Sequence, residues 1–251
     1  MPSSDLPTPS LPSLPQVLII GAGGWGREVL ALLQADPAYG KAWTVQGFLD
    51  SRSHLLDGLN YASTPVMGDP LTYAPGPQDL FVCALGDPHQ RERYSRPLQE
   101  AGGRFLRIHA HALLGPRVQL GEGCLLSHLT QISPDVQVGD FVNIQTQTVV
   151  GHDVQIGDYA QIGAMVFIGG EATIGRHAVI HPHATITAGM QIGEGATVGA
   201  GAVVVKNVPA GATVFGNPAR VIFHAPSTDR PCANVAAPSP QASTAYNTQE
   251  S

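Results

Sequence analysis

The sequence predicts an α/β N-terminal Rossmann-like domain followed by an all-β parallel β-helix. Two observations predict this order. The apolar run Val17 to Ile20 leads directly into the glycine-rich segment Gly21 to Gly26 and then into a helical pattern. From Ile108 onward, every sixth residue is aliphatic, which is typical of a hexapeptide-repeat β-helix. We place the α/β domain at residues 16–106 and the β-helix at residues 107–223.

Composition limits the partners and the compartment. The net charge is −6 and no cluster of lysine or arginine is visible, so nucleic acid is not expected as a partner. The cysteines, Cys83, Cys124 and Cys232, are far apart, so neither a disulfide framework nor a metal site is indicated. No apolar run reaches the roughly 18 residues of a membrane span. Because no secretory signal is visible either, we expect a cytoplasmic protein.

The flanking segments and the first domain follow in order. Residues 1–15 and 224–251 are rich in proline and small polar residues, so both are expected to be disordered. In the α/β domain we expect a strand at 17–20, a helix ending near Gly40, strands at 45–49 and 81–86, a helix at about 88–101, and a lead-in at 105–108.

The glycine-rich turn is the candidate ligand site of this domain. Gly21, Gly23 and Gly26 have the GxGxxG spacing, and glycines let backbone N–H groups approach a phosphate at a helix N-terminus. Asp50 follows the second strand, where a carboxylate can accept hydrogen bonds from ribose hydroxyls. The region is short for a dinucleotide domain, so a mononucleotide or nucleotide-sugar site is favoured. An NAD site, or glycines that serve only strand–helix packing, are the alternatives.

The repeat segment extends from Ile108 to Val208. Its aliphatic residues recur at every sixth position from Ile108 to Val204 without a change of register. The aliphatic residue of each hexad and the small residue four positions later are expected to point inward and to stack in ladders. The glycine that often occupies the second position is expected to permit a turn with φ > 0. Three hexads form one triangular coil. A closing segment, Gly216 to Arg220, follows the repeat.

These motifs resemble a known family. The six-residue repeat, the Gly-Asn-Pro-Ala-Arg ending and the start Ile-Ile-Gly-Ala-Gly-Gly-Trp-Gly-Arg-Glu-Val are similar to left-handed parallel β-helix acetyltransferases of the hexapeptide-repeat superfamily. The start narrows the resemblance to the subgroup of sialic-acid O-acetyltransferases and UDP-4-amino-sugar (bacillosamine-type) N-acetyltransferases. The resemblance covers residues 16–223.

The resemblance implies acetyl-CoA as donor, a homotrimer, and a donor groove between neighbouring β-helices. It also implies an acceptor sugar, nucleotide-activated and used in surface-glycan biosynthesis, that binds the N-terminal domain. The substrate-binding residues expected there are Gly21, Gly23, Gly24, Trp25, Gly26, Asp50 and Gly86. The residues expected to bind the donor are Gln161, Gly170, Pro182, Ala200, Gly201 and Arg220.

His152 is the expected catalytic base. An amine or hydroxyl that attacks a thioester must lose a proton, and an imidazole is suited to accept it. Asp153 follows directly and can orient the ring, while the resemblance assigns the oxyanion to the backbone N–H of Gly170. Two departures from the family stand out. Gln161 replaces a histidine that family members often carry nine residues after the base, and Trp25 replaces a histidine in the glycine motif.

Other functions share these features. The acceptor could be sialic acid or another small hydroxyl compound, as in a serine-type O-acetyltransferase, although the attached N-terminal domain disfavours the serine type. A non-catalytic β-helix scaffold is the interpretation from a different class. A zinc-bearing relative would need converging histidines, and His128 differs from His152 by one hexad in phase.

Overall fold

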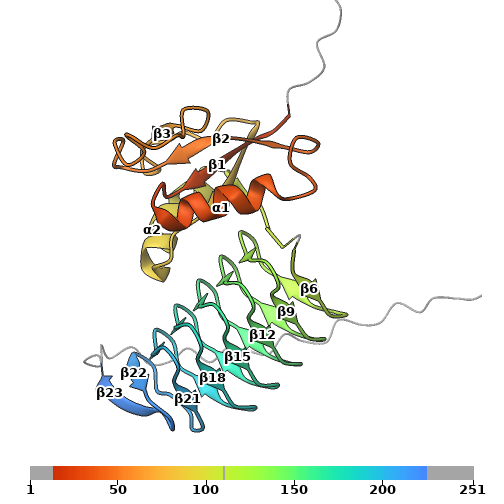
Figure 1. Ribbon diagram of the computed structural model, residues 1–251, viewed down its shortest axis with the longest axis vertical. Coiled ribbons are helices and arrows are strands. Elements are labelled where there is room, and N and C mark those ends of the chain that lie inside the picture. The colour runs from red at the N-terminus through yellow and green to blue at the C-terminus, as the bar shows by residue number, and fades with distance from the viewer. Residues whose placement is uncertain (1–13, 110, 225–251) are drawn as a thin grey trace, which may run out of the picture.

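The computed structural model describes residues 14–109 and 111–224, so most of the two segments expected to be disordered lies outside the described residues. Within these residues the chain forms the two predicted domains in the predicted order. Figure 1 shows the α/β domain at the end of the β-helix where the repeat begins, with β23 at the far end.

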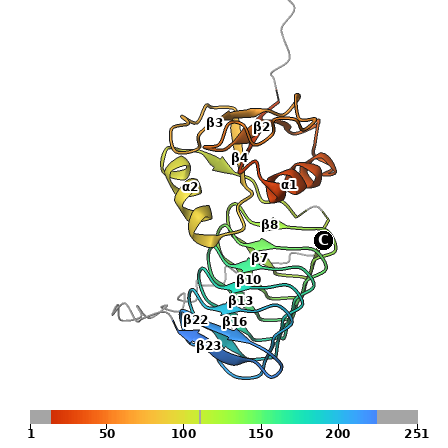
Figure 2. The ribbon, with the colours of Figure 1, turned by 60° about the vertical axis from the view of Figure 1, so that its left-hand side comes forward.

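The α/β domain is a five-stranded parallel sheet in the order β3-β2-β1-β4-β5. Leucine and valine side chains of α1 pack on one face of the sheet, while Leu98 of α2 packs on the other. Figure 2 shows the two helices on opposite sides of this domain, above the first coils of the β-helix. The elements are β1 (Gln16–Ile20), α1 (Gly24–Gln34), β2 (Thr44–Leu49), β3 (Val66–Gly68), β4 (Asp79–Cys83), α2 (Pro88–Glu100) and β5 (Arg104–Phe105).

Two element ends differ from the sequence prediction, and one strand was not predicted. Helix α1 ends at Gln34 rather than near Gly40. Asp36 precedes Pro37, and a residue before proline disfavours the helical conformation, so the helix stops early. Strand β4 ends at Cys83 instead of continuing to Gly86. Strand β3, of only three residues, was not predicted.

The β-helix consists of three parallel sheets in which each strand pairs with the strand three hexads further along, as Val150 pairs with Ile168. One sheet holds β7 (Gln119–Leu120), β10 (Gln137–Val138), β13 (Gln155–Ile156), β16 (Thr173–Ile174) and β19 (Gln191–Ile192). The second holds β8 (Leu125–Leu126), β11 (Asn143–Ile144), β14 (Gln161–Ile162), β17 (Val179–Ile180), β20 (Thr197–Val198), β22 (Ala212–Phe215) and β23 (Arg220–His224). The third holds β6 (Leu113–Leu114), β9 (Gln131–Ile132), β12 (Val149–Val150), β15 (Phe167–Ile168), β18 (Thr185–Ile186) and β21 (Val203–Val204).

The interior of the β-helix confirms the predicted ladders. In the hexads from Leu126 to Val204 the aliphatic residue and the small residue are buried together, as Ile162 and Ala160 are, both 0% exposed, with Met190 only partly buried. In the first coil Leu114 remains 38% exposed. Cys124 belongs to this core, and burial raises the pKa of its thiol to about 12. It is therefore a packing residue, not a reactive thiolate.

The role expected for the second-position glycines was wrong. Positive φ falls instead on the fourth residue of the hexad, where Asp153 has φ 58° and Tyr159 has φ 59°. The second-position glycines serve the contact between coils. A Cβ on Gly151 would lie 2.5 Å from the backbone nitrogen of Gly170 in the next coil, so only glycine fits there.

The last coil of the repeat is shorter than the others. Val198 of β20 pairs with Val214 of β22, which follows it by less than three full hexads, so the segment 206–209 breaks the pattern as expected. Strand β23 then turns back antiparallel on β22 and extends this sheet at its last coil. Arg220 therefore lies at the far end of the molecule from the α/β domain (Figure 1).

Candidate active site

Turns between the three sheets form three edges, which we name by one residue each. The His152 edge comprises residues 115–118, 133–136, 151–154, 169–172 and 187–190. The Tyr159 edge comprises residues 121–124, 139–142, 157–160, 175–178 and 193–196. The Pro182 edge comprises residues 127–130, 145–148, 163–166, 181–184 and 199–202.

His152 and Asp153 form a hydrogen-bonded pair on the His152 edge. The His152 Nδ1 lies 2.8 Å from Asp153 Oδ2, and both side chains are more than half exposed. Asp153 occupies the left-handed position of its hexad, with φ 58°. Because an ionised carboxylate only accepts hydrogen bonds, Nδ1 carries the proton, and Nε2 of a neutral ring keeps its lone pair for an incoming proton.

Gly170 lies beside the free nitrogen of His152. A Cβ on Gly170 would be 2.7 Å from His152 Nε2, so any larger residue would press on the imidazole. Among the described residues, the Gly170 N–H donates no hydrogen bond, while its carbonyl accepts one from Gly189. Gly170, with its backbone N–H unpaired among the described residues, therefore lies close to the imidazole of His152.

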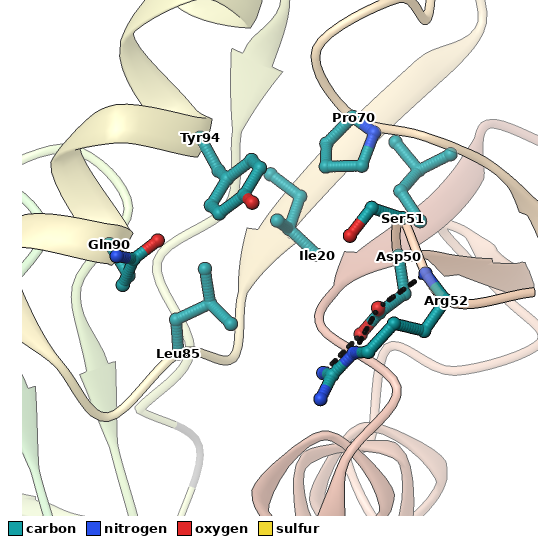
Figure 3. A pocket seen from close by; sticks show the side chains of 9 residues that line it. Ile20, Asp50, Ser51, Arg52, Pro70, Leu85, Gln90 and Tyr94 are labelled. Atoms are coloured by element: carbon teal, nitrogen blue, oxygen red, sulfur yellow. Dashed lines mark hydrogen bonds and ion pairs between the residues drawn. The ribbon is translucent and has the colours of Figure 1, made fainter. Parts of the chain in front are cut away.

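A pocket of ≈ 270 Å³ lies at the carboxyl ends of β1, β2 and β4, where parallel sheets bind ligands (Figure 3). Asp50 lines it and is 7% exposed. Its carboxylate accepts the Ala22 N–H at 3.0 Å and a two-pronged bond from Arg52. Burial raises the pKa of Asp50, but the bonds from Arg52 and Ala22 outweigh burial and lower the pKa overall. Asp50 therefore holds the glycine turn in place and stays ionised.

The four glycines of the turn divide into two pairs. Gly21 has φ 100°, and a Cβ there would meet Leu85, while a Cβ on Gly26 would overlap the carbonyl oxygen of Gly21. Packing alone accounts for these two. A Cβ on Gly23 would meet nothing within 4 Å, and one on Gly24 only the end of Arg27. Gly23 is also the N-cap of α1 without a side-chain cap, which leaves the first helical N–H groups open to an anion.

Trp25 sits partly buried over the Pro182 edge. Its ring packs against the core under α1, and its Nε1 is buried without a partner among the described residues. Trp25 and Glu28 of α1 line a pocket together with His128 and Gln145 of the β-helix. The other residues expected to bind the acceptor lie on the glycine turn or in the Figure 3 pocket, apart from Gly86.

Gly86, Gln161 and Pro182 line one groove of ≈ 420 Å³ between the α/β domain and the β-helix. Gly86 comes from the loop before α2, Gln161 from β14, and Pro182 from the Pro182 edge. Gly201 donates its N–H to the Pro182 carbonyl at 3.0 Å, so Ala200 and Gly201 continue this edge by one coil. Arg220 is exposed on β23, and within the described part of the chain its side chain donates only to the neighbouring Ala219 carbonyl.

The expected donor-binding residues thus do not converge within one chain. Gly170 lies with His152 on one edge, whereas Pro182, Ala200 and Gly201 lie on another. The α/β domain contacts β14 and the Tyr159 and Pro182 edges through α2 and α1. His152 lies between the other two sheets, on the edge opposite the sheet that the α/β domain covers.

The sequence analysis missed several residues of the site. Arg52, Gln90 and Tyr94 line the Figure 3 pocket, and Arg91 crosses from α2 into the β-helix. No motif distinguishes Gln90, Tyr94 or Arg91, and the bond from Arg91 to Gln161 spans 70 residues of sequence. Arg52 does have a local signal, its charge pair with Asp50 directly after a strand.

Residues 14–109 and 111–224 were searched for helices that could span a membrane and for side-chain clusters that could bind a metal. None of the helices found there has the length and apolar character needed to traverse a bilayer. Within the same ranges, histidine, cysteine and acidic side chains form no group of three or more that could hold a metal ion.

Comparison with protein families gives two matches. Residues 16–98 match the PglD N-terminal domain, and residues 135–170 and 171–206 each match the bacterial transferase hexapeptide (six repeats). A sequence search of curated proteins gives no match. The first family match covers nearly all of the α/β domain, and the second covers most coils of the β-helix.

Solved structures resemble the whole described chain. The acetyltransferase domain of PglB from Neisseria gonorrhoeae, in complex with acetyl coenzyme A, is 28% identical, with TM-score 0.74 over 84% of this chain and 100% of that one. PerB from Caulobacter crescentus, in complex with CoA and GDP-perosamine, is 28% identical, with TM-score 0.74 over 84% and 99%. WeeI from Acinetobacter baumannii is 30% identical, with TM-score 0.61 over 82% and 99%. The chain therefore belongs to the hexapeptide-repeat acetyltransferases that carry a PglD-type N-terminal domain, and it is an acetyl-CoA-dependent enzyme.

Proposed function

We propose that the enzyme transfers the acetyl group of acetyl-CoA to the amino group of a nucleotide-activated amino sugar of the kind used in surface glycans. The pocket at the strand ends beside the open N-terminus of α1 carries this proposal, because it suits a nucleotide and its phosphates. The complex of PerB with CoA and GDP-perosamine supports the same acceptor class.

In this proposal His152 is the general base. Its Nε2 accepts the proton that the attacking amine loses while the new C–N bond forms, and Asp153 holds the ring through Nδ1. The Gly170 N–H donates to the oxygen of the thioester carbonyl as negative charge develops there. When the C–S bond breaks, His152 returns its proton to the departing thiolate, so the ring ends as it began.

The proposed site is completed by a neighbouring subunit of a homotrimer. His152 and Gly170 lie on one edge, while Pro182 and Gly201 lie on another, so the two sets meet only if two chains pack side by side. The sheet between these edges has the surface for such packing. Its outward side chains include Leu113, 69% exposed, and Phe167, 47% exposed. The sheet that holds β13 instead presents glutamines and a threonine.

The test measures CoA release and the mass of the sugar product with acetyl-CoA and a panel of UDP- and GDP-linked amino sugars. Sialic acid and other free hydroxyl acceptors form a second panel. We expect an N-acetylated sugar nucleotide. His152→Asn should lower kcat/KM for it by about 10²- to 10⁴-fold, because a positioned base contributes that much.

Two variants complete the comparison. Asp153→Asn should cause a smaller loss, since Nδ1 keeps a hydrogen-bond partner. His54→Asn, at an exposed histidine in the loop after β2, is the matched control and should keep wild-type activity. Full activity of the folded His152→Asn protein would contradict the assignment of the base. Acetylation of the hydroxyl panel alone would replace the proposed acceptor with an O-acetylated one.

A further inference from the structure

Arg91 is the most deeply buried charged side chain of the described residues, at 0% exposure. It starts in the first turn of α2 and ends inside the contact with the β-helix. Its guanidinium donates to the carbonyls of Leu85, Tyr159 (2.6 Å) and Ala160 (3.1 Å), and to Gln161 Oε1 at 2.9 Å. All four acceptors are neutral. Burial lowers the pKa of Arg91 to about 10, which still leaves it charged at neutral pH.

This contact fixes which end of the Gln161 amide faces which way. A guanidinium has five donors and no acceptor, so only the amide oxygen of Gln161 can face Arg91. The NH₂ end must then point the other way. It has no partner among the described residues, and Gln161 lines the groove together with His181, Pro182 and Thr197. The NH₂ group of Gln161 is therefore a hydrogen-bond donor at the groove. The amide cannot flip while its oxygen is bonded to Arg91.

Arg91 also fixes the opposite wall of the groove. Leu85 O accepts from both Arg91 and the Asn143 side chain, which lies one coil before Gln161. Gly86, the next residue, lines the groove, while Leu85 itself lines the nucleotide-type pocket. One side chain thus sets the positions of the loop between the two cavities and of the Gln161 amide.

We propose that Arg91 is a positioning residue that locks the Gln161 amide so that its NH₂ group donates a hydrogen bond to a carbonyl oxygen of the acyl-CoA donor in this groove. The proposal rests on the proposed function, because it takes the groove as part of the donor site. The carbonyl belongs either to the thioester or to an amide of the pantetheine arm. Both carbonyl oxygens accept a hydrogen bond in the same way. Free CoA carries the pantetheine amides but not the thioester carbonyl.

Gln161→Glu is the decisive variant. A glutamate keeps an oxygen for Arg91 and adds an ionic attraction, so the domain contact and the thermal stability should be retained or raised. The NH₂ donor is replaced by an oxygen that cannot donate. A purely structural role for the pair predicts no change in donor binding, whereas the proposed role predicts a weaker one.

The experiment measures Kd for acetyl-CoA and for CoA by calorimetry, and the separate KM values of the two substrates. Gln161→Glu should raise Kd for acetyl-CoA by roughly tenfold, the effect of one lost hydrogen bond, and leave the sugar KM unchanged. A rise for acetyl-CoA alone identifies the thioester carbonyl, and a rise for both ligands identifies a pantetheine amide.

Arg91→Lys tests the lock itself. A lysine has a single ammonium in place of the planar fork, so the amide regains freedom to turn, and Kd should rise by a smaller factor with some loss of stability. Arg96→Lys, an exposed arginine on the same helix, is the matched control. Wild-type Kd values for both ligands in folded Gln161→Glu protein overturn the proposal. If the wild-type protein itself binds neither ligand, the function proposed above fails first.

Discussion

At the second residue of most hexads, the missing Cβ of glycine sets how closely the coils can stack. Gly175 lies under Glu194 of the next coil, and a Cβ there would be 2.5 Å from the Glu194 nitrogen. Gly195, at the fourth position of its own hexad, has φ 63° and open space around a hypothetical Cβ. Two glycines on the same edge thus have opposite requirements, the first for space and the second for backbone conformation.

Separate substitutions of Gly175 and Gly195 should distinguish the requirement for space from the requirement for backbone conformation. Gly175→Ala should lower the free energy of unfolding by about 1–3 kcal/mol, the usual cost of overpacking, because backbone must shift to admit the methyl group. Gly195→Asn should change it by less than about 0.5 kcal/mol, since asparagine tolerates a left-handed turn. Denaturant titration of both variants measures the difference. Equal losses would contradict this distinction between space and backbone conformation.

At the same scale, the predictability of the site depended on how local each contact is. His152 and Asp153 are sequence neighbours, so their pairing could be anticipated, although the positive φ of Asp153 could not. Gln161 was expected to bind the donor. Its bond to Arg91 spans 70 residues and follows from how α2 lands on the coils, which no pattern within either segment encodes.

At the scale of elements, α2 joins the two domains through ionic contacts as well as through Arg91. Glu92 bonds Arg176, and its Oε2 lies 2.8 Å from His177 Nε2. The His89 and Tyr159 rings both lie against the His177 ring, in tilted arrangements with centroids 4.5 Å and 5.5 Å away. Burial, with help from Arg176 and His89, lowers the pKa of His177 below 6.5, and Glu92 opposes this shift only in part.

This environment predicts a pH-dependent contact. Because the unfolded chain binds a proton near pH 6.5 while folded His177 resists it, stability should fall as pH drops below about 6.5. The slope from this group is at most about 1.4 kcal/mol per pH unit. His177→Asn should remove that part of the slope between pH 6.5 and 5, as measured by denaturant titration at each pH.

The neighbouring carboxylate acts at lower pH. Burial raises the pKa of Glu92, but Arg176 and His177 lower it overall, so its contribution is lost only when pH falls through that depressed pKa. His54→Asn serves as the exposed control and should leave the slope unchanged. An unchanged slope in His177→Asn would instead mean that other groups carry the pH dependence.

The elements themselves were predictable where the pattern was long. Strict six-residue spacing predicted the strands from β6 to β21, and the apolar run before the glycine turn predicted β1. Short segments without periodicity were missed, as β3 was, because three residues carry too little pattern to stand out. The end of α1 was placed near Gly40, but Pro37 lies before that glycine and the helix already ends at Gln34.

At the scale of the whole molecule, the separation of the His152 and Pro182 edges makes the proposed assembly a requirement for activity. Phe167 lies in β15, in the middle of the sheet proposed to form the contact between subunits. Phe167→Glu should shift the protein from trimer to monomer and reduce acetyl transfer in parallel. Light scattering coupled to size-exclusion chromatography measures the mass. Gln155→Glu, on the sheet that holds β13 and presents glutamines, is the matched control for the added charge. An active monomer would contradict the shared site.

The constant length of the coil, three hexads, has one further consequence. Each coil advances the chain by one strand spacing, about 4.8 Å. The α/β domain is anchored to β14 through Arg91, and His152 precedes β14 by less than one coil. The number of coils therefore sets the distance along the β-helix axis between two of its residues in fixed steps. As long as the pairing of strands three hexads apart is kept, the axial separation between the His152 edge and the point where Arg91 anchors the α/β domain can change only by whole coils, that is, three hexads at a time.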